Sequence, residues 1–376
     1  MTDLATTRET GTEGPTAGPA SVAPLLRMAR ETPTRLWNDS ATPAELSAAI
    51  DWGAVGATCN PVIALAALRN DLPRWQARIR EYADAHPTAS ESEIGWAMVK
   101  ELSVEAAALL MDAFAEHRGR NGRLSVQTDP RLYRDSTALV AQAVEFDALA
   151  PNVIVKIPAT ENGIHAMEEA TYRGVSINAT VSFTVPQAVA VAEAIERGLQ
   201  RREAEGSDVG SMGPVCTIMV GRLDDWLKRV AARDVITVDP GVLEWAGVAV
   251  FKRAYEVFQE RGFRTRLLSA AFRNHMHWSQ LVGGDVVVSP PYEWQVRLNA
   301  SGIEPLPRID EPVADAVLDT LYGKFPEFRR AYDVDGMAPA EFQEFGATRT
   351  TLRQFLTACN DLEGVVRDVL LPDPGR

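Results

Sequence analysis

Cysteine is scarce in this chain of 376 residues, which contains three: Cys59, Cys216 and Cys359. They are far apart and odd in number, so neither a disulfide framework nor a paired-cysteine metal site is expected. No run approaches the roughly 18 apolar residues of a transmembrane helix. The amino terminus lacks the apolar core of a secretory signal. These absences favour a reducing compartment, so we predict a cytoplasmic protein without a membrane partner.

Positive charge is also in deficit, with 38 Lys and Arg against 51 Asp and Glu and a net charge of −13. A nucleic-acid-binding protein needs a basic face, and an anionic membrane surface needs one too, so both partners are disfavoured. A phosphorylated substrate is still compatible with an acidic chain, provided that Arg or Lys side chains cluster locally. The sequence contains neither a dinucleotide-binding glycine motif nor a phosphate-binding P-loop.

What the chain does contain is an ordinary globular composition, 46% hydrophobic and 24% charged. The exception is residues 1–22, which are rich in Thr, Gly, Pro and Glu and have almost no large apolar side chains. We predict a disordered tail there, because such a segment cannot bury enough apolar surface to fold.

From residue 23 onward, short apolar runs alternate with longer helical patterns. Eight runs are almost continuously apolar and read as parallel strands covered on both faces. They lie at residues 34–40, 53–61, 122–130, 152–160, 175–183, 214–222, 265–274 and 285–291. Eight strands interleaved with helices predict an α/β fold, a (β/α)8 TIM barrel over residues 23–300. A doubly wound sheet with a second domain is the alternative.

The last part of the chain, residues 301–376, is predicted to be a helical extension packed on the barrel. Residues 305–345 look irregular and contain proline, and a long amphipathic helical pattern follows them. This extension could cap the bottom of the barrel, form a dimer contact or cover the mouth.

Lys156 is the least expected residue of the eight runs, because Val153, Ile154, Val155 and Ile157 surround it. Desolvation disfavours a charged ammonium group and lowers its pKa. A neutral amine is what imine formation with a carbonyl compound requires. The alternative is a lysine at a strand end whose ammonium group reaches solvent. Lys156 alone does not decide between these two interpretations.

Polar residues follow several other apolar runs. They are Asp39, the pair Asn178 and Thr180 on one strand face, and Thr217 with Arg222. The carboxyl ends of barrel strands converge on one mouth, where barrel enzymes act. Each residue also has a structural alternative, a helix cap for Asp39 and strand-end hydrogen bonding for Asn178 and Thr180. Taken together, the set favours an active site.

A metal site is a weaker hypothesis. His275 and His277 have a spacing that places two imidazoles on one strand face. The pair follows a strand, however, and is expected to open a helix, and no third ligand is placed to complete a coordination shell. Asp224 and Asp225 are expected to begin a helix, where negative charge is favourable, and Trp226 is expected in the core. We therefore predict no metal.

Several of these runs together resemble the transaldolase family. GATCNP (56–61) is similar to that family's second-strand signature. The stretch 152–184 resembles its Schiff-base region, in which a K-I-P-x-T run precedes an N-x-T run by about 22 residues. TIMVGRLDDW (217–226) and LLSAAFRN (267–274) resemble its sixth- and seventh-strand signatures. Similar runs extend from about 36 to 290, and their order and spacing make the resemblance specific.

The resemblance implies a class I, Schiff-base mechanism. Lys156 would form an imine with a ketose carbonyl, and Asp39 would accept the C4 hydroxyl proton as the C3–C4 bond breaks. Asn60 and Asn178 would bind hydroxyls of the dihydroxyacetone unit, and Thr180 would position a catalytic water. No cofactor or metal is implied, because the iminium group replaces a Lewis acid.

The resemblance also implies a phosphate site, and at some positions this chain differs from the family pattern. Thr217 stands where the family has a substrate-contacting Ser, and Arg222 and Arg273 would bind phosphate through bidentate guanidinium contacts. Gln127 stands where the main transaldolases have a Glu that activates water. An amide holds water by hydrogen bonds but cannot take its proton. The fructose-6-phosphate aldolase branch shares Gln127 but pairs it with a Tyr, where this chain has Met219.

Three functions follow from these observations. The first is transaldolase transfer of a dihydroxyacetone unit between sugar phosphates, as in the pentose phosphate pathway. The second, favoured by Gln127, is an aldolase that releases free dihydroxyacetone. The third is a non-catalytic barrel that binds a sugar phosphate, supported by Gln127 and by Ala271, which replaces a family Ser. Barrels of this kind often dimerise, so a homodimer is an open alternative to a monomer.

Overall fold

The computed structural model describes residues 22–375, and within them eight parallel strands close into a barrel in sequence order. The predicted (β/α)8 barrel is therefore confirmed, and the doubly wound alternative is wrong. The expected tail, residues 1–22, lies outside the described residues except for Val22. The strands are β1 (Arg35–Asn38), β2 (Ala54–Cys59), β3 (Arg123–Gln127), β4 (Val153–Pro158), β5 (Ile177–Ser182), β6 (Val215–Ile218), β7 (Arg266–Ala270) and β8 (Val287–Ser289).

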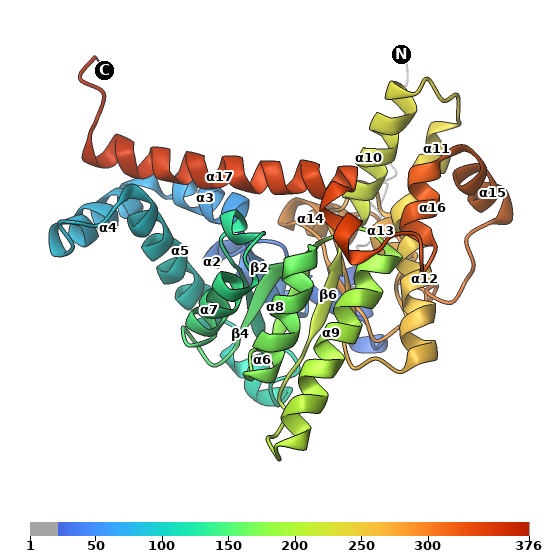
Figure 1. Cartoon of the computed structure of the whole chain (residues 1–376), viewed down its shortest axis with the longest axis horizontal. Coiled ribbons are helices and arrows are strands. Elements are labelled where there is room, and N and C mark those ends of the chain that lie inside the picture. The colour runs from blue at the N-terminus through green and yellow to red at the C-terminus, as the bar shows by residue number, and fades with distance from the viewer. Residues whose placement is uncertain (1–21, 376) are drawn as a thin grey trace, which may run out of the picture.

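Helices surround this barrel, and additional helices precede it and follow it (Figure 1). Those before β6 are α1 (Pro24–Glu31), α2 (Pro43–Asp51), α3 (Pro61–Asn70), α4 (Leu72–Ala85), α5 (Glu91–Ala108), α6 (Met111–Glu116), η1 (Pro130–Leu132), α7 (Ser136–Asp147), α8 (Glu161–Tyr172) and α9 (Val185–Ala204). Those after it are α10 (Val220–Arg233), α11 (Pro240–Leu243), α12 (Ala246–Arg261), α13 (Met276–Ser279), α14 (Tyr292–Ala300), α15 (Asp315–Lys324), α16 (Pro326–Tyr332), η2 (Pro339–Glu344) and α17 (Gly346–Leu370).

Helix starts close to the mouth of the barrel are encoded locally. Thr184 precedes α9, and its hydroxyl accepts a hydrogen bond from the Gln187 N–H at 3.2 Å. Thr160 caps α8 in the same way, by accepting from the Gly163 N–H at 3.1 Å. A polar side chain that satisfies an otherwise unpaired N–H specifies where a helix begins. Each cap therefore ends a βα loop and fixes how far the preceding strand extends.

The interior of the barrel is packed with large apolar side chains rather than hollow. Trp37 from β1 is fully buried there beside Ile154 from β4 and Leu268 from β7. A Cβ atom on Gly56 of β2 would lie 2.4 Å from the Trp37 ring, so only glycine fits at that position. Because side chains alternate along a strand, residues two positions after these apolar ones form the next layer toward the carboxyl end.

The carboxyl-terminal extension covers the end of the barrel at which the strands finish. Helix α17 runs across that end (Figure 1) and packs against α3, α5 and the end of β5. Of the three placements open from the sequence, this corresponds to a cover over the mouth. The expectation that residues 305–345 are irregular is wrong in part, because α15 and α16 lie there. Phe325 and Phe328 bury their rings in the core, which stabilises these short helices. Pro326 stands at the first position of α16, where proline is compatible with a helix.

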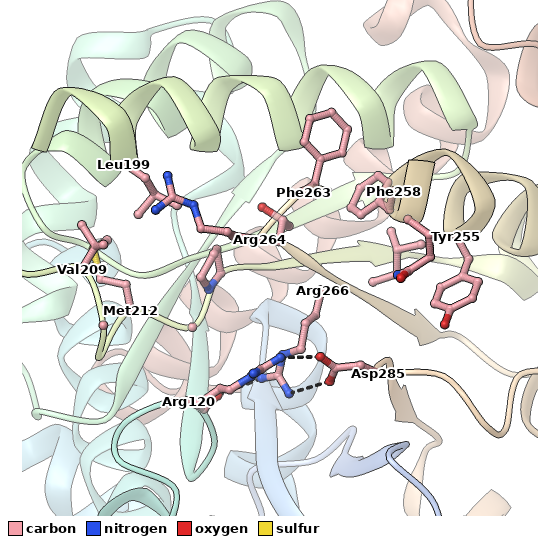
Figure 2. A pocket seen from close by; sticks show the side chains of 16 residues that line it. Arg120, Leu199, Val209, Met212, Tyr255, Phe258, Phe263, Arg264, Arg266 and Asp285 are labelled. Carbon is pink, nitrogen blue, oxygen red and sulfur yellow. Dashed lines mark hydrogen bonds and ion pairs between the residues drawn. The ribbon is translucent and has the colours of Figure 1, made fainter. Parts of the chain in front are cut away.

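A solvent-open cavity of about 440 Å³ lies at the opposite, amino-terminal end of the strands. Figure 2 shows Arg120, Arg266 and Asp285 grouped at one side of it, with an ion pair between Arg120 and Asp285. Arg266 is buried and donates to Asn121 Oδ1 at 3.0 Å. Barrel enzymes act at the carboxyl end of the strands, so this cavity is not the expected location of an active site.

No helix among residues 22–375 combines the length and the apolar character needed to cross a bilayer.

Candidate active site

Lys156 lies inside the carboxyl-terminal half of β4, two residues after the interior residue Ile154. Its side chain is 4% exposed, and within residues 22–375 its Nζ atom forms no hydrogen bond or ion pair. Desolvation lowers the pKa of Lys156 to about 8, assisted by the positive charge of Arg222 and opposed by Asp39. The interpretation of Lys156 as a lysine that reaches solvent at a strand end is therefore wrong.

Asp39 follows β1 directly and lies two residues after Trp37, whose side chain is inside the barrel. Because side chains alternate along a strand, Asp39 is on the same side as Trp37. Burial raises the pKa of the Asp39 carboxyl, and the charges of Lys156 and Arg222 oppose that rise. The sequence offered a helix cap as the alternative for Asp39. Helix α2 instead begins after Thr42, and no side chain caps it. Asp39 is thus electrostatically coupled to Lys156, and burial favours the protonated form of its carboxyl.

Asn178 on β5 joins three strands through hydrogen bonds inside the barrel. Its Nδ2 donates to Ser125 Oγ on β3 at 2.7 Å, and its Oδ1 accepts from Thr217 Oγ1 on β6 at 2.7 Å. In the strand register, Asn178 also pairs with Lys156. The structure therefore brings Asn178 and Thr217 together, as expected. It also adds Ser125, a partner that sequence reasoning missed because β3 and β5 are not adjacent in the barrel.

Gln127 and Thr180 flank the lysine on the two neighbouring strands. Gln127 pairs in register with Lys156, and Thr180 pairs with Pro158. Both side chains are buried, yet Gln127 Oε1 and Thr180 Oγ1 have no hydrogen-bond partner within residues 22–375. Buried polar atoms are almost always paired, so two unpaired acceptors beside the lysine indicate a place for a polar ligand.

The end of β5 is distorted immediately after Thr180. Val181 has a φ of +53°, an unusual value for a β-branched residue, and the β5–β6 register shifts between Ala179 and Ser182. Bulges of this kind occur beside active sites, where they re-aim side chains at the end of a strand. The strain at Val181 therefore accompanies the unpaired hydroxyl of Thr180.

Asn60 has a structural role that the sequence did not separate from a binding role. It follows β2 and caps α3, with its Oδ1 accepting from the N–H groups of Val62 at 2.9 Å and Ile63 at 3.0 Å. Only its Nδ2 is left to contact a ligand. Asn60 is at the carboxyl end of β2, and within residues 22–375 no hydrogen bond connects it to Lys156.

Arg222 and Arg273, predicted to bind phosphate, line one small cleft between α10, the loop after β7 and α17. The Arg222 guanidinium donates through Nη1 to Thr351 and Gln354, both on α17. Its Nε is buried and has no partner within residues 22–375. Desolvation and the nearby charge of Arg273 lower the pKa of Arg222. The two cations repel each other, so the cleft favours an anion between them.

The guanidinium of Arg273 is more fully occupied than that of Arg222. Its Nε and Nη2 contact Asp225 Oδ2 at 2.9 and 2.8 Å, and its Nη1 donates to the carbonyls of Ala271 and Phe272. Ala271 has a φ of +63°, which turns its carbonyl toward the arginine. The structure thus holds Arg273 rigidly at the cleft, with few free donors.

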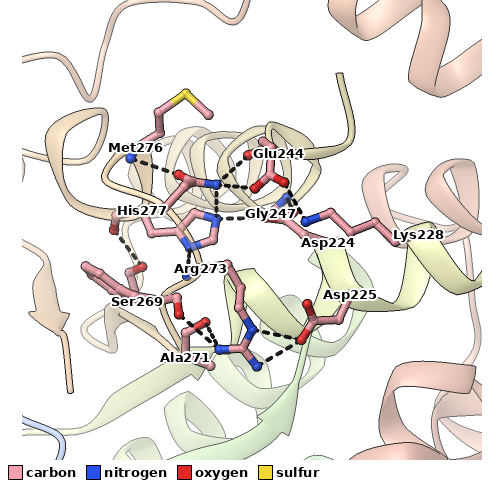
Figure 3. A network of polar contacts seen from close by, with 12 residues as sticks. Asp224, Asp225, Lys228, Glu244, Gly247, Ser269, Ala271, Arg273, Met276 and His277 are labelled. Atoms are coloured by element: carbon pink, nitrogen blue, oxygen red, sulfur yellow. Dashed lines mark hydrogen bonds and ion pairs between the residues drawn. The ribbon is translucent and has the colours of Figure 1, made fainter. Parts of the chain in front are cut away.

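A buried pair beneath this loop explains its rigidity (Figure 3). The Arg273 N–H donates to His277 Nδ1 at 3.1 Å, so the ring proton is assigned to Nε2, which donates to Asp224 Oδ2 at 2.8 Å. The other Asp224 oxygen accepts from the Gly247 N–H at 2.8 Å. Burial raises the pKa of Asp224. The pair joins α10, α12 and the loop after β7.

The expectation that Asp224 and Asp225 begin a helix is wrong, because α10 starts at Val220. Successive helical residues project about 100° apart, so Asp224 faces the interior while Asp225 faces the cleft. Trp226 is half-buried beside the cleft rather than fully in the core. Within residues 22–375, no three His, Cys, Asp or Glu side chains converge to hold a metal ion.

Sequence reasoning missed Arg229, which lines the cleft on the same face of α10 as Arg222. The signal was present, because seven residues are two helical turns and place both side chains on one face. It also missed Thr351 and Gln354 of α17. No pattern within α17 could have indicated that they contact Arg222, which lies 129 and 132 residues earlier.

Fold and site together define a (β/α)8 barrel with a desolvated lysine and a carboxylate at the carboxyl end of its strands, beside a basic cleft. The chain belongs to the transaldolase/fructose-6-phosphate aldolase family, whose model matches residues 36–313. The resemblance noted in the sequence motifs is thereby confirmed.

Individual relatives share about 30% of their residues with this chain over the matched regions. The chain is 32% identical over 209 residues to transaldolase 1 of Streptomyces avermitilis, covering 55% of this chain and 54% of that protein. It is 28% identical over 277 residues to a transaldolase of Thiobacillus denitrificans, covering 68% and 74% of the two chains. With a transaldolase of Arthrobacter sp. the identity is 33% over 214 residues, or 55% of each chain. The matches thus span about half the length of the Streptomyces and Arthrobacter relatives.

Proposed function

We propose that this protein transfers a dihydroxyacetone unit from a ketose phosphate to an aldose phosphate through an imine on Lys156. The observation that carries the proposal is the buried Lys156 amine, whose pKa is lowered to about 8. An amine with this pKa has a substantial neutral fraction near neutral pH, and the neutral form is the nucleophile. Membership of the family and the names of the relatives support the same activity.

In the first step, the Lys156 nitrogen adds to the C2 carbonyl of the ketose, and loss of water forms a protonated imine. Gln127 pairs in register with Lys156, and Thr180 lies two residues after Asn178, the β5 residue that pairs with the lysine. The Gln127 Oε1 and the Thr180 hydroxyl have no hydrogen-bond partner within residues 22–375. They are suited to hold the released water and the substrate hydroxyls by hydrogen bonds.

In the second step, the C3–C4 bond breaks and its electron pair moves into the protonated imine, which becomes an enamine. The C4 hydroxyl becomes an aldehyde, and its proton passes to Asp39. Burial raises the pKa of Asp39, so this carboxylate is a stronger base than a solvated one. It can accept the proton and later return it to the product of the second half-reaction.

The remaining enamine adds to an acceptor aldehyde in the transferase reaction, and hydrolysis of the new imine releases the product. A second candidate is an aldolase, in which protonation of the enamine carbon gives an imine, and water hydrolyses this imine to free dihydroxyacetone and the Lys156 amine. Gln127 favours it, since an amide in place of a carboxylate changes how water is activated beside Lys156. The two candidates differ in whether turnover requires an acceptor.

The phosphate group of the substrate is proposed to lie in the cleft with Arg222 and Arg273. Guanidinium groups bind phosphate through charge-assisted hydrogen bonds, and α17 shields this cleft on one side. We further propose that residues 23–300 act as the catalytic barrel and residues 301–376 as its cover. The family context supports a place among the sugar-phosphate interconversions of the pentose phosphate pathway, in the cytoplasm.

Borohydride reduction in the presence of fructose 6-phosphate tests the imine. The expected result is a reduced three-carbon adduct on the wild type, seen by intact mass and mapped to Lys156, and no adduct on Lys156→Ala. Turnover is then measured with and without erythrose 4-phosphate. Dependence on this acceptor supports the transferase, and release of dihydroxyacetone without it supports the aldolase. A wild type without any adduct contradicts both.

A further inference from the structure

The guanidinium of Arg222, which lines the cleft, has one edge without a hydrogen-bond partner among residues 22–375. Both Nη1 hydrogens are taken by Thr351 Oγ1 and Gln354 Oε1 of α17. The Nε atom is buried and unpaired within residues 22–375. The Nε–Nη2 edge is the one that binds a phosphate with two parallel hydrogen bonds. Helix α17 therefore orients this arginine with its anion-binding edge free.

Arg229 lies two turns further along α10 and lines the same cleft. It is exposed, and no hydrogen bond or ion pair connects it to another of the described residues 22–375. It is thus a cation without a counter-ion beside Arg222 and Arg273. An unpaired arginine in a cleft with two others is a poor stabiliser of the fold, because the three charges repel.

Charge and helix geometry point to the same ligand. The cleft is lined by Arg222, Arg229 and Arg273 against a single carboxylate, that of Asp225, which leaves two positive charges. A phosphate monoester carries about −1.5 to −2 near neutral pH and would balance them. The first turn of α17 also borders the cleft, and no side chain caps its N–H groups. Free N–H groups at a helix start favour an anion.

We propose that the phosphate site is a composite, in which Arg229 contacts the phosphate as a third cation and α17 positions Arg222 for it. This inference rests on the proposed function and deepens it, since it makes Arg229 a determinant of preference for phosphorylated substrates. Thr351 and Gln354 are positioning residues, because they act on the substrate through Arg222. Helix α17 lies beyond residues 36–313, the region that matches the family model, so this part of the site belongs to the extension.

Calorimetric titration of the full chain with inorganic phosphate tests the role of Arg229. Arg229→Gln is compared with Arg353→Gln, a matched control that removes one exposed arginine of α17 outside the cleft. We expect the dissociation constant of Arg229→Gln to be about tenfold larger than that of the wild type, because one charge-assisted hydrogen bond is lost. The control should change little. Equal affinity of wild type and Arg229→Gln, or equal weakening in both variants, overturns the inference.

Kinetics separate this inference from the proposed function. Arg229→Gln should raise KM for fructose 6-phosphate about tenfold with little change in kcat, and should leave KM for unphosphorylated fructose unchanged. Thr351→Val should raise the same KM, whereas Thr351→Ser, which keeps the hydroxyl, should restore it. Failure of the proposed function appears differently, as absence of a borohydride adduct on Lys156 with either sugar. An adduct with unchanged KM values overturns only the composite site.

Discussion

The protonation of Lys156 gives the sharpest quantitative test of the site. Desolvation lowers its pKa from 10.5 to about 8. At pH 7 a lysine with the lower value is roughly one-tenth neutral, whereas a solvated lysine is about 0.03% neutral. The neutral, reactive fraction is therefore about 300-fold larger in the folded protein. Such a difference is far larger than the error of a rate measurement.

Competitive labelling with acetic anhydride measures this fraction directly. The acetylation rate of Lys156, followed by peptide mass spectrometry from pH 6 to 11, should rise to a plateau with a midpoint near 8. A solvated lysine in a model peptide is the reference. In Asp39→Asn the midpoint should move lower, because the carboxylate raises the pKa of the lysine. A midpoint near 10.5 would refute the argument from desolvation.

Three further outcomes follow from the same structure. Lys156→Met should raise the free energy of unfolding by about 3 kcal/mol at pH 6. This gain should shrink between pH 8 and 10.5, because the native lysine there loses the proton that the unfolded chain retains. Urea titration at several pH values measures the free energy of unfolding. Gly221→Ala should lower the free energy of unfolding by about 1–3 kcal/mol, because the new Cβ would lie 2.1 Å from the Ala271 carbonyl oxygen. The control Gly364→Ala has open space around the new Cβ and should leave the free energy of unfolding unchanged. Equal effects of the two variants would contradict the reasoning. His277→Asn should lower the free energy of unfolding by about 1–3 kcal/mol, because Oδ2 of the buried Asp224 loses its donor while Oδ1 keeps the Gly247 N–H. The same variant should raise KM for the phosphorylated donor more than it changes kcat. Unchanged stability would show that the pair is not a constraint.

Local sequence patterns were sufficient for the strands and for the lysine. Parallel strands buried on both faces are continuously apolar, and a lysine inside such a run stands out without any structure. Polar residues at strand ends, such as Asp39 and Thr180, were identifiable because the barrel brings all carboxyl ends to one mouth. The helix that starts after Thr184 was predictable for a similar reason, because its cap is formed by neighbours in sequence.

Contacts between distant segments were not predictable in this way. Asp224 and His277 are 53 residues apart, and nothing in either local pattern shows that one accepts a hydrogen bond from the other. The role of Asn60 was similarly ambiguous, since an asparagine before a proline can cap a helix, bind a ligand through its free amide, or do both.

The sequence by itself determined the barrel, the lysine and the order of the residues around it, because these depend on hydrophobic periodicity and on the alternation of side chains along strands. Only the tertiary structure decided how the mouth is closed. Helix α17 could have packed on any apolar face of the barrel, and its amphipathic pattern is the same in each case. Its contacts with Arg222 and its place over the strand ends arise from packing between segments more than a hundred residues apart, which no local pattern encodes.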